Sequence, residues 1–314
     1  MAVHQIGEGG LVMYWVTFGL MAFSALAFAV MTFTRPLNKR SHGYITLAIV
    51  TIAAIAYYAM AASGGKALVS NPDGNLRDIY YARYIDWFFT TPLLLLDIIL
   101  LTGIPIGVTL WIVLADVAMI MLGLFGALST NSYRWGYYGV SCAFFFVVLW
   151  GLFFPGAKGA RARGGQVPGL YFGLAGYLAL LWFGYPIVWG LAEGSDYISV
   201  TAEAASYAGL DIAAKVVFGW AVMLSHPLIA RNQTDGSLLI NSTNDPFVAS
   251  TTHIPERQGG IFGGLMGKKR GAGTPLATNE GVPRKAAPTA ATTTAGNPAT
   301  AAEVRTPREL MARL

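Results

Sequence analysis

The sequence predicts an all-α, polytopic membrane protein folded as a seven-transmembrane-helix bundle. The first observation is composition. Apolar residues make up 54% of the 314 residues, charged residues make up 12%, and the mean hydropathy is +0.52. Soluble domains carry about 25% charged residues, so this composition excludes most soluble enzymes, coiled coils and disordered chains. With Cys142 as its one cysteine, the chain can form neither a disulfide framework nor a cysteine-rich metal site, and we expect no metal.

The second observation is that seven apolar stretches are long enough to cross a hydrocarbon core about 30 Å thick, which needs roughly 20 residues of helix. In chain order they are residues 11–33, 44–63, 79–101, 104–128, 133–154, 167–191 and 201–229. The segments between them carry the glycine, proline, serine or charged residues that end helices. These segments are 35–40, 64–77, 102–103, 129–132, 155–166 and 192–200.

The chain is therefore expected to have three parts. Residues 1–10 form a short N-terminus without a basic cluster, so the first stretch is expected to be a retained helix and not a signal peptide. Residues 11–231 form the membrane domain. Residues 232–314 are rich in Ala, Thr, Pro and Gly, and we expect them to form a flexible tail.

The basic residues of the short loops predict the orientation in the membrane, because such residues concentrate on the cytoplasmic side. One set of loops carries Arg35, Lys39, Arg40, Lys158, Arg161, Arg163 and Arg231. In the other set, three basic residues are diluted by Asp and Glu. We expect the protein to lie in the plasma membrane, with its N-terminus outside and its C-terminus in the cytoplasm. The small net charge of +5 does not indicate nucleic acid as a partner.

Ionisable residues at membrane depth are costly and therefore mark candidate functional positions. They are Arg83, Asp86, Asp97, Asp116, Asp211 and Lys215. Asp86 and Asp97 are eleven positions apart, which in a helix places them about 20° from a common face and about 16 Å apart along the axis. Such a layout is typical of a relay that passes a proton in steps across the membrane.

Lys215 has two interpretations. It lies four positions after Asp211, so the two can form a simple ion pair that holds helices together. A desolvated lysine is also a good Schiff-base former. An aromatic stripe on the sixth stretch favours the second interpretation, although such stripes are usually helix packing or an interface belt. Its members and the residues at matching depths are Trp182, Tyr185, Pro186, Trp189, Trp87, Met119, Gly123, Tyr137 and Tyr138. These residues suit a flat, elongated, apolar cofactor derived from an aldehyde.

Three motifs resemble those of microbial rhodopsins. Residues 83–97 (RYIDWFFTTPLLLLD) are similar to the third-helix motif of that family, and residues 211–215 (DIAAK) resemble its retinal-attachment motif. The pattern Trp182-x-x-Tyr185-Pro186-x-x-Trp189 resembles its sixth-helix retinal wall. The resemblance covers residues 11–231, and the amino acids of the third-helix motif resemble those of fungal proton-pumping members.

The resemblance implies roles for the charged residues. Lys215 would carry all-trans retinal as a protonated Schiff base, with Asp86 as counterion and proton acceptor and Asp211 as second counterion. Asp97 matches the proton donor. Arg83, Glu203 and Glu193 match the proton-release group. The Schiff base and Arg83 would balance the two aspartates, and Arg83 would swing toward Glu203 after proton transfer.

The resemblance also implies supporting residues. The retinal pocket would include Thr91 and Leu94 in addition to the aromatic residues above, with tyrosines at 137 and 138 where archaeal pumps have tryptophans. Leu94 matches a position where leucine accompanies green absorption. Asp116 would be a protonated hydrogen-bond partner between helices. The other supporting residues would be Thr90 and three tyrosines around the two counterion carboxylates, Tyr58, Tyr80 and Tyr185.

The function that this resemblance implies is a light-driven outward proton pump, which is an ion transporter and not an enzyme. Its partners would be membrane lipid and protons, and a homo-oligomer stays open. The alternative is a photosensory rhodopsin that signals through a partner or its tail, but a sensor does not need the donor Asp97. A chloride or sodium pump is disfavoured by carboxylates at both the acceptor and donor positions. A retinal-free receptor would leave Lys215 without a purpose.

Overall fold

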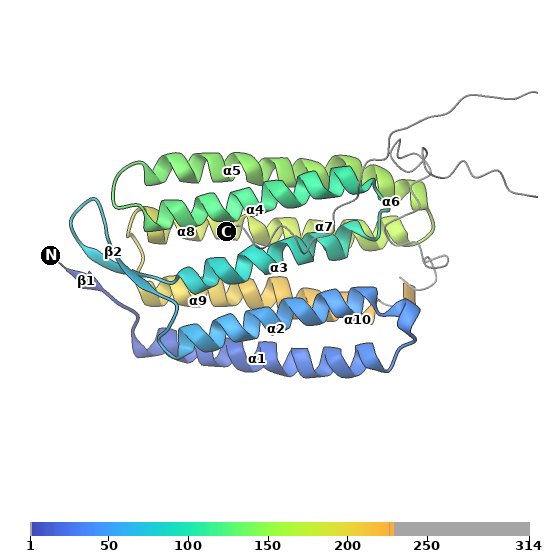
Figure 1. The fold of residues 1–314 in the computed structure, drawn as a ribbon, viewed down its shortest axis with the longest axis horizontal. Coiled ribbons are helices and arrows are strands. Elements are labelled where there is room, and N and C mark those ends of the chain that lie inside the picture. Colours follow the sequence, from blue (N-terminus) through green and yellow to red (C-terminus); the bar gives the residue numbers. More distant parts are fainter. Residues whose placement is uncertain (1, 226, 229–314) are drawn as a thin grey trace, which may run out of the picture. The chain divides into compact units, whose positions relative to one another are not determined.

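The computed structural model describes residues 2–225 and 227–228, so the expected tail, 232–314, lies outside the described residues. The long helices of the bundle run roughly parallel to one another (Figure 1). Five of them are α1 (Glu8–Phe33), α2 (Ser41–Ala61), α3 (Tyr81–Ile99), α4 (Ile106–Leu128) and α5 (Arg134–Gly151). A short helix, η1 (Leu37–Lys39), connects α1 to α2.

The sixth and seventh membrane segments are each built from several pieces. The sixth comprises α7 (Val167–Trp182), α8 (Gly184–Trp189) and the π-helix η3 (Gly190–Gly194). The seventh comprises α9 (Val200–Asp211), the π-helix η4 (Ile212–Val217) and α10 (Phe218–Leu224). π-Turns inside α-helices are rare and are frequently found at functional sites, and η4 contains Lys215.

Six segments of the described chain have the length and hydropathy to cross a membrane, and α3 is the remaining helix of the bundle. Its 19 residues include Arg83, Asp86 and Asp97, which lower its hydropathy. All three side chains are buried inside the bundle, whereas large apolar side chains such as Phe23 and Leu180 face outward. This inside-out distribution of polarity is expected of a bundle surrounded by lipid.

The expected break at residues 155–166 is wrong in its position. After α5, the helix continues through the π-helix η2 (Leu152–Gly156) and α6 (Ala157–Arg163), and ends at Gly164 with a φ of +68°. Pro155 therefore lies inside a helix. A proline lacks the backbone N–H that an α-helix needs, and the wider π-turn accommodates this loss.

A small sheet caps one end of the bundle, in the segment expected only as a connection (Figure 1). Strands β2 (Ala67–Ser70) and β3 (Leu76–Ile79) form an antiparallel hairpin, and β1 (Val3–His4) pairs with β3 in parallel. The turn between β2 and β3 uses Gly74 at a φ of +81°. We call this end of the bundle the sheet end, and the end that carries α6 the opposite end.

Candidate functional site

Lys215 lies between two carboxylates in the interior of the bundle. Its Nζ is 2.5 Å from Oδ2 of Asp86 on α3 and 3.0 Å from Oδ1 of Asp211, at the end of α9. All three side chains are at most 1% exposed. The π-turn of η4 carries Lys215 only four positions after Asp211. The bundle therefore brings together the three residues that the sequence singled out, and a buried amine is compensated by two nearby acids.

The two carboxylates differ in their hydrogen bonds. Asp211 accepts from the hydroxyls of Tyr57 and Tyr185, each at 2.7 Å, and from Nε1 of Trp87 at 3.2 Å. Asp86 accepts from Lys215 through Oδ2, and its Oδ1 is buried without a hydrogen-bond partner among the described residues. Asp211 therefore has three neutral donors in addition to Lys215, whereas the hydrogen bond to Asp86 comes from the lysine.

Two of the three tyrosines expected around the carboxylates are not there. Tyr58 is 51% exposed and packs against Trp15 and Phe18 on the outer face of the bundle, so the neighbouring Tyr57 takes its place. Tyr80 is buried, but its hydroxyl has no hydrogen-bond partner among the described residues and its ring packs edge-on against Tyr14. Successive residues of a helix point about 100° apart, so one of two adjacent tyrosines can face inward while the other faces outward. The sequence alone could not show which of the two faces inward.

Arg83 is directed toward the sheet end and not toward Asp86. Its Nη1 is 2.7 Å from Glu203 and its Nη2 donates to the hydroxyl of Tyr14 at 2.9 Å. The guanidinium also lies 4.3 Å from the centre of the Tyr207 ring. The contact between Arg83 and Glu203, which was expected to form after proton transfer, is therefore already present in this structure.

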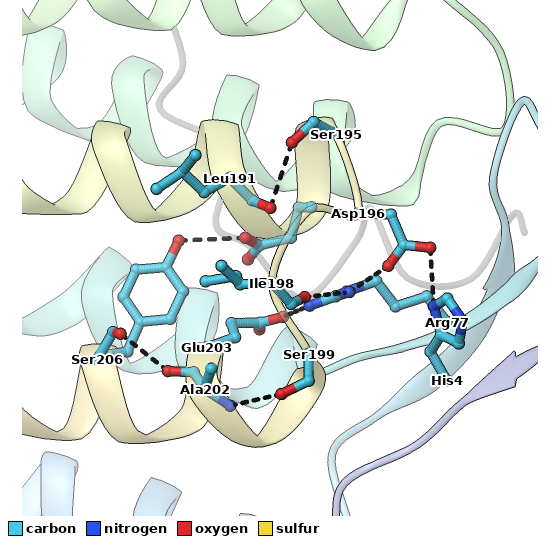
Figure 2. Close-up of polar contacts among 12 residues, drawn as sticks. His4, Arg77, Leu191, Ser195, Asp196, Ile198, Ser199, Ala202, Glu203 and Ser206 are labelled. Carbon is cyan, nitrogen blue, oxygen red and sulfur yellow. Dashed lines mark hydrogen bonds and ion pairs between the residues drawn. The ribbon is translucent and has the colours of Figure 1, made fainter.

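Glu203 is held by a second arginine that the sequence analysis counted only as a loop charge. Nη2 of Arg77, on β3, is 2.7 Å from Glu203, and Nη1 of Arg77 bonds to Asp196 and to the carbonyl oxygen of Ile198. His4 on β1 contacts the same Asp196 at 2.8 Å. Figure 2 shows this chain of contacts from the sheet to α9.

The charges of this network reinforce one another. Partial burial acts to raise the pKa of Asp196, but hydrogen bonds from His4 and Arg77 outweigh it and hold the pKa below its ordinary value. Burial opposes the charge on Arg77, yet the neighbouring Glu203 carboxylate raises the pKa of Arg77 above its ordinary value. Arg77 therefore stays charged and ties the sheet to Glu203.

Glu193, on η3, completes the group at the sheet end. It accepts hydrogen bonds from the hydroxyls of Tyr84 at 3.1 Å and Tyr207 at 3.2 Å, and its Oε1 lies 3.7 Å from Nη1 of Arg83. The two glutamates expected to act together thus share Arg83 as a neighbour. Glu203 is bonded by two arginines, whereas Glu193 is bonded mainly by neutral hydroxyls, so the two carboxyl groups are not equivalent.

An apolar cavity that is partly open at the surface lies next to Asp211, because Trp87 and Tyr185 of its wall both hydrogen-bond to that carboxylate, and Lys215 itself is not part of the wall. Nine expected residues line it: Trp87, Thr91, Met119, Gly123, Tyr138, Trp182, Tyr185, Pro186 and Trp189. Six further lining residues were not expected: Tyr84, Ile120, Ser141, Cys142, Phe145 and Tyr207. Most of these lie on helix faces that the sequence could not orient, although Tyr207 is four positions before Asp211.

Two expected members of the cavity wall lie outside it. Tyr137 is 40% exposed and packs against Phe125 on the outer surface of the bundle, so Tyr138 alone of this pair faces inward. Leu94 is buried in the apolar core beside the cavity and does not line it. Tyr138 stacks on Trp189 with ring centres 4.8 Å apart and donates to the carbonyl oxygen of Pro186.

Hydrogen bonds between side chains fix the two remaining aspartates of the membrane segments. Asp116 on α4 accepts from the hydroxyl of Thr91 at 2.7 Å, which joins α3 to α4 as expected of a link between helices. Thr90 donates to the backbone carbonyl oxygen of Asp86 and so acts within α3.

Asp97 contacts Nδ1 of His42 at 2.6 Å, a partner that the sequence analysis missed. The feature of the sequence that could have pointed to this contact is that His42 is a lone histidine near the start of an apolar stretch.

The chain is similar to known proteins over most of the described bundle. A family model described as "Bacteriorhodopsin-like protein" matches residues 9–227. Opsin-1 of Neurospora crassa is 37% identical over 249 residues, which cover 74% of this chain and 81% of that protein. The opsin-like protein carO of Fusarium fujikuroi is 40% identical over 222 residues, which cover 68% of this chain and 72% of that protein.

Solved structures give the same result. The light-driven proton pump LR (Mac) from Leptosphaeria maculans matches with a TM-score of 0.71 and 35% identity, covering 74% of this chain and 100% of that one. Halorhodopsin, a light-driven chloride pump, matches with a TM-score of 0.68 and 28% identity, covering 73% of this chain and 99% of that one. Proteins that move different ions therefore share this fold.

Proposed function

The chain belongs to the bacteriorhodopsin-like family of membrane proteins, and from this we propose that it is a light-driven outward proton pump that holds all-trans retinal covalently at Lys215. Family members bind retinal and include light-driven ion pumps, which are transporters and not classical enzymes. The transported ion differs among them, so the choice of the proton has to come from the residues of this chain.

The cavity and its neighbouring lysine fit retinal. The cavity walls are mostly aromatic, and Trp87 and Tyr185 extend from the wall to Asp211, beside Lys215. A buried amine next to an apolar cavity can hold an aldehyde-derived polyene as a Schiff base, and two carboxylates offset the charge of its proton. When bound, retinal would supply a light-driven isomerisation that displaces the proton on the lysine nitrogen.

The observation that carries the proposal is the order of proton-binding groups along the bundle. Asp97 lies toward the opposite end, Lys215 and Asp86 lie in the middle, and Glu203 and Glu193 lie at the sheet end. Asp86 receives the lysine proton through Oδ2, which the lysine nitrogen already contacts, while Asp211 is held by hydrogen bonds from three neutral donors. Asp97 then returns a proton to the lysine nitrogen.

The direction of transport follows from the loop charges. The positive-inside rule assigns the sheet end to the outside and the opposite end to the cytoplasm. Protons would then enter through Asp97 and leave past Arg83, Glu203 and Glu193. A chloride pump on this fold would need an anion beside Lys215, and the carboxylate of Asp86 would repel it.

The test is the pH of an unbuffered suspension of cells or sealed vesicles that contain the protein with retinal. Illumination should acidify the outside, and a protonophore should abolish the change. Asp86→Asn should stop acidification and shift the absorption to the red, whereas the matched variant Asp73→Asn, in the exposed hairpin turn, should keep both. A retinal band without a light-driven pH change would contradict the pump and favour the photosensory alternative.

A further inference from the structure

His42 is a buried histidine that the function proposed above does not use. It is the second residue of α2, its side chain is 4% exposed, and its Nδ1 lies 2.6 Å from Oδ1 of Asp97 on α3. This contact joins residues 55 positions apart in the sequence, so only the assembled bundle creates it. A second titratable group at hydrogen-bond distance from Asp97 bears directly on how that carboxyl group receives its proton.

Thr46 provides hydrogen bonds for both charge states of Asp97. Its Oγ1 is 2.8 Å from Oδ2 of Asp97 and 2.8 Å from the carbonyl oxygen of His42, one turn earlier. A hydroxyl has one proton to donate. Thr46 can give this proton to an ionised Asp97, or give it to the carbonyl oxygen and accept from a protonated Oδ2. A carboxyl group that must lose and regain a proton needs such a neighbour.

The second ring nitrogen of His42, Nε2, is the atom of the His42–Asp97 pair that has no hydrogen-bond partner among the described residues. This atom is buried. Buried polar atoms are almost always satisfied, so an orphaned one needs an explanation. Because Asp97 occupies Nδ1, the ring can exchange a proton with water only through Nε2. His42 lies where α2 begins, near the opposite end of the bundle, and this is the end at which protons would enter.

We propose that His42 is the proton-entry group of the donor site, and that it loads Asp97 with protons taken from cytoplasmic water. The inference rests on the proposed pump function, because it concerns the step that reloads Asp97. Loading starts from a neutral ring that carries its proton on Nδ1. A hydronium ion of the cytoplasmic water gives a proton to Nε2 and becomes water, and the Nδ1–H bond then breaks as that proton moves to Oδ1 of the Asp97 carboxylate, which lies 2.6 Å from Nδ1. The products are a neutral acid and a neutral ring with its proton on Nε2, and a change of tautomer returns the ring proton to Nδ1 between turnovers.

Asp97 is the charged group that contacts His42. The partial positive charge at the N-terminus of α2 favours such an anionic partner. The basic side chains that precede α2 are Arg35, Lys39 and Arg40. Arg35 and Arg40 are bonded to backbone carbonyl oxygens. Helix α10 and the second half of α1 pack against α2 and have no titratable side chain. Helix α3 presents Asp97 to His42.

The first test measures the recovery of absorbance after a flash in the retinal-bound protein, at two pH values. His42→Gln keeps a side chain that can hydrogen-bond to Asp97 but cannot relay a proton. We expect its recovery to slow at least tenfold and to become pH-dependent, and added azide, a small proton carrier, should restore the speed. Thr51→Val, on the exposed face of the same helix, should recover like the parent.

The same measurement separates loading from mere support of the fold. A structural role would give slow recovery that azide does not restore, or a lost pigment, and that result would overturn the proposal. Recovery of His42→Gln at the parental rate would overturn it too. If Asp97→Asn slows recovery and His42→Gln does not, Asp97 takes its proton directly from water.

A second measurement needs neither light nor retinal. Nitrogen-15 NMR of the labelled histidine rings in the retinal-free protein reports which ring nitrogen carries a proton and whether it is hydrogen-bonded. His42→Gln assigns the His42 signals among the four histidines. We expect Asp97→Asn to move these signals, and Asp116→Asn, which removes a buried carboxyl group elsewhere, to leave them unchanged.

The two proposals fail separately. If the parent protein does not acidify the medium, the pump function falls, while the NMR result still decides whether His42 and Asp97 share a proton. If the parent acidifies the medium but the His42 signals ignore Asp97→Asn, the loading role falls and the pump function stands.

Discussion

At the scale of single residues, the contrast between Tyr57 and Tyr58 is decisive for the site. Tyr57 is fully buried and donates to Asp211 at 2.7 Å, whereas Tyr58 is half exposed on the outer face. The two lie side by side in the sequence with the same chemistry. Their different roles therefore come from the rotation of α2 about its axis, and a pair of matched substitutions can measure the difference.

We predict that Tyr57→Phe lowers the free energy of unfolding by about 1.5–3 kcal/mol, because it removes a buried hydrogen bond to a charged acceptor. Tyr58→Phe should change it by less than about 0.5 kcal/mol, since the ring contacts with Trp15 and Phe18 remain. Denaturant titration of the two purified variants checks this. Equal losses in both variants would contradict the assignment of Tyr57 to the carboxylate site.

The inequality of Asp86 and Asp211 belongs to the same scale. Both touch Lys215, and the sequence offered no reason to prefer either except the resemblance. The structure supplies one, since Asp211 has three neutral donors and Asp86 has an oxygen without a partner among the described residues. A carboxylate that many donors stabilise is a poor proton acceptor, and this favours Asp86 for the transfer.

At the scale of elements, the small sheet is what closes the bundle around Glu203. Strand β3 carries Arg77, whose guanidinium reaches both Glu203 and Asp196, and β1 carries His4 to the same Asp196. The sheet is also joined to α3 through glycine. Gly65, at a φ of +65°, accepts a hydrogen bond from the backbone N–H of Ala82 at 3.0 Å.

Two glycines of this region allow a matched prediction. Gly65 and Gly74 both have positive φ, so alanine at either position should cost about 1–2 kcal/mol of backbone strain. A Cβ at Gly65 would in addition overlap the methyl group of Ala82, whereas a Cβ at Gly74 meets nothing within 4 Å. Gly65→Ala should therefore destabilise the protein clearly more than Gly74→Ala in thermal unfolding. The reverse order would show that the hairpin does not pack on α3 as described.

The contacts of Asp196 predict how the sheet responds to acid. Its pKa lies below the ordinary value of 3.8 because His4 and Arg77 bond to the charged form against the effect of burial. A depressed pKa gives stability that is complete above the ordinary value and is lost as the pH falls through the depressed one. The protection of β1 and β3 amides against hydrogen exchange, measured relative to the intrinsic rate at each pH, should therefore fall below about pH 4. Asp196→Asn should show less protection at neutral pH and a smaller further loss in acid.

At the scale of the whole molecule, the bundle assembles a lysine, two aspartates and a cavity from helices far apart in the sequence. Lys215 contacts Asp86 across 129 positions, and Tyr57 contacts Asp211 across 154. A cofactor that occupies the cavity and bonds to Lys215 would stabilise the folded state over the unfolded one, because only the folded chain presents the complete site.

We predict that addition of all-trans retinal to the retinal-free protein raises its unfolding temperature and produces a visible absorption band. Lys215→Ala should lose both effects, because Lys39 and Lys158 are exposed and Lys66 is paired with Asp78. A scan of absorbance and thermal unfolding with and without retinal checks this. A visible band in Lys215→Ala that resists hydroxylamine in the dark would contradict attachment at this residue.

The sequence by itself determined the helices and the buried charged residues that lie together in the interior of the bundle. Apolar stretches of about 20 residues have few alternatives to membrane helices, and α3 was recovered despite its three charges because the residues between these charges are mostly apolar. Lys215, Asp86 and Asp211 were identified because ionisable groups at membrane depth are rare. Nine of the cavity-lining residues followed from the resemblance and from helical spacing.

The tertiary structure decided which side of each helix faces which neighbour. The rotation of each helix about its axis decides that Tyr57 and not Tyr58 faces inward, that Tyr138 and not Tyr137 does, and that His42 meets Asp97. Hydropathy does not reveal this rotation when both faces of a helix are apolar. The same holds for Arg77, which as a loop residue had no predictable partner until the hairpin folded onto Glu203. Local sequence fixes a helix because its hydrogen bonds are local, but contacts across 50 to 150 positions are chosen by the packing of the whole bundle.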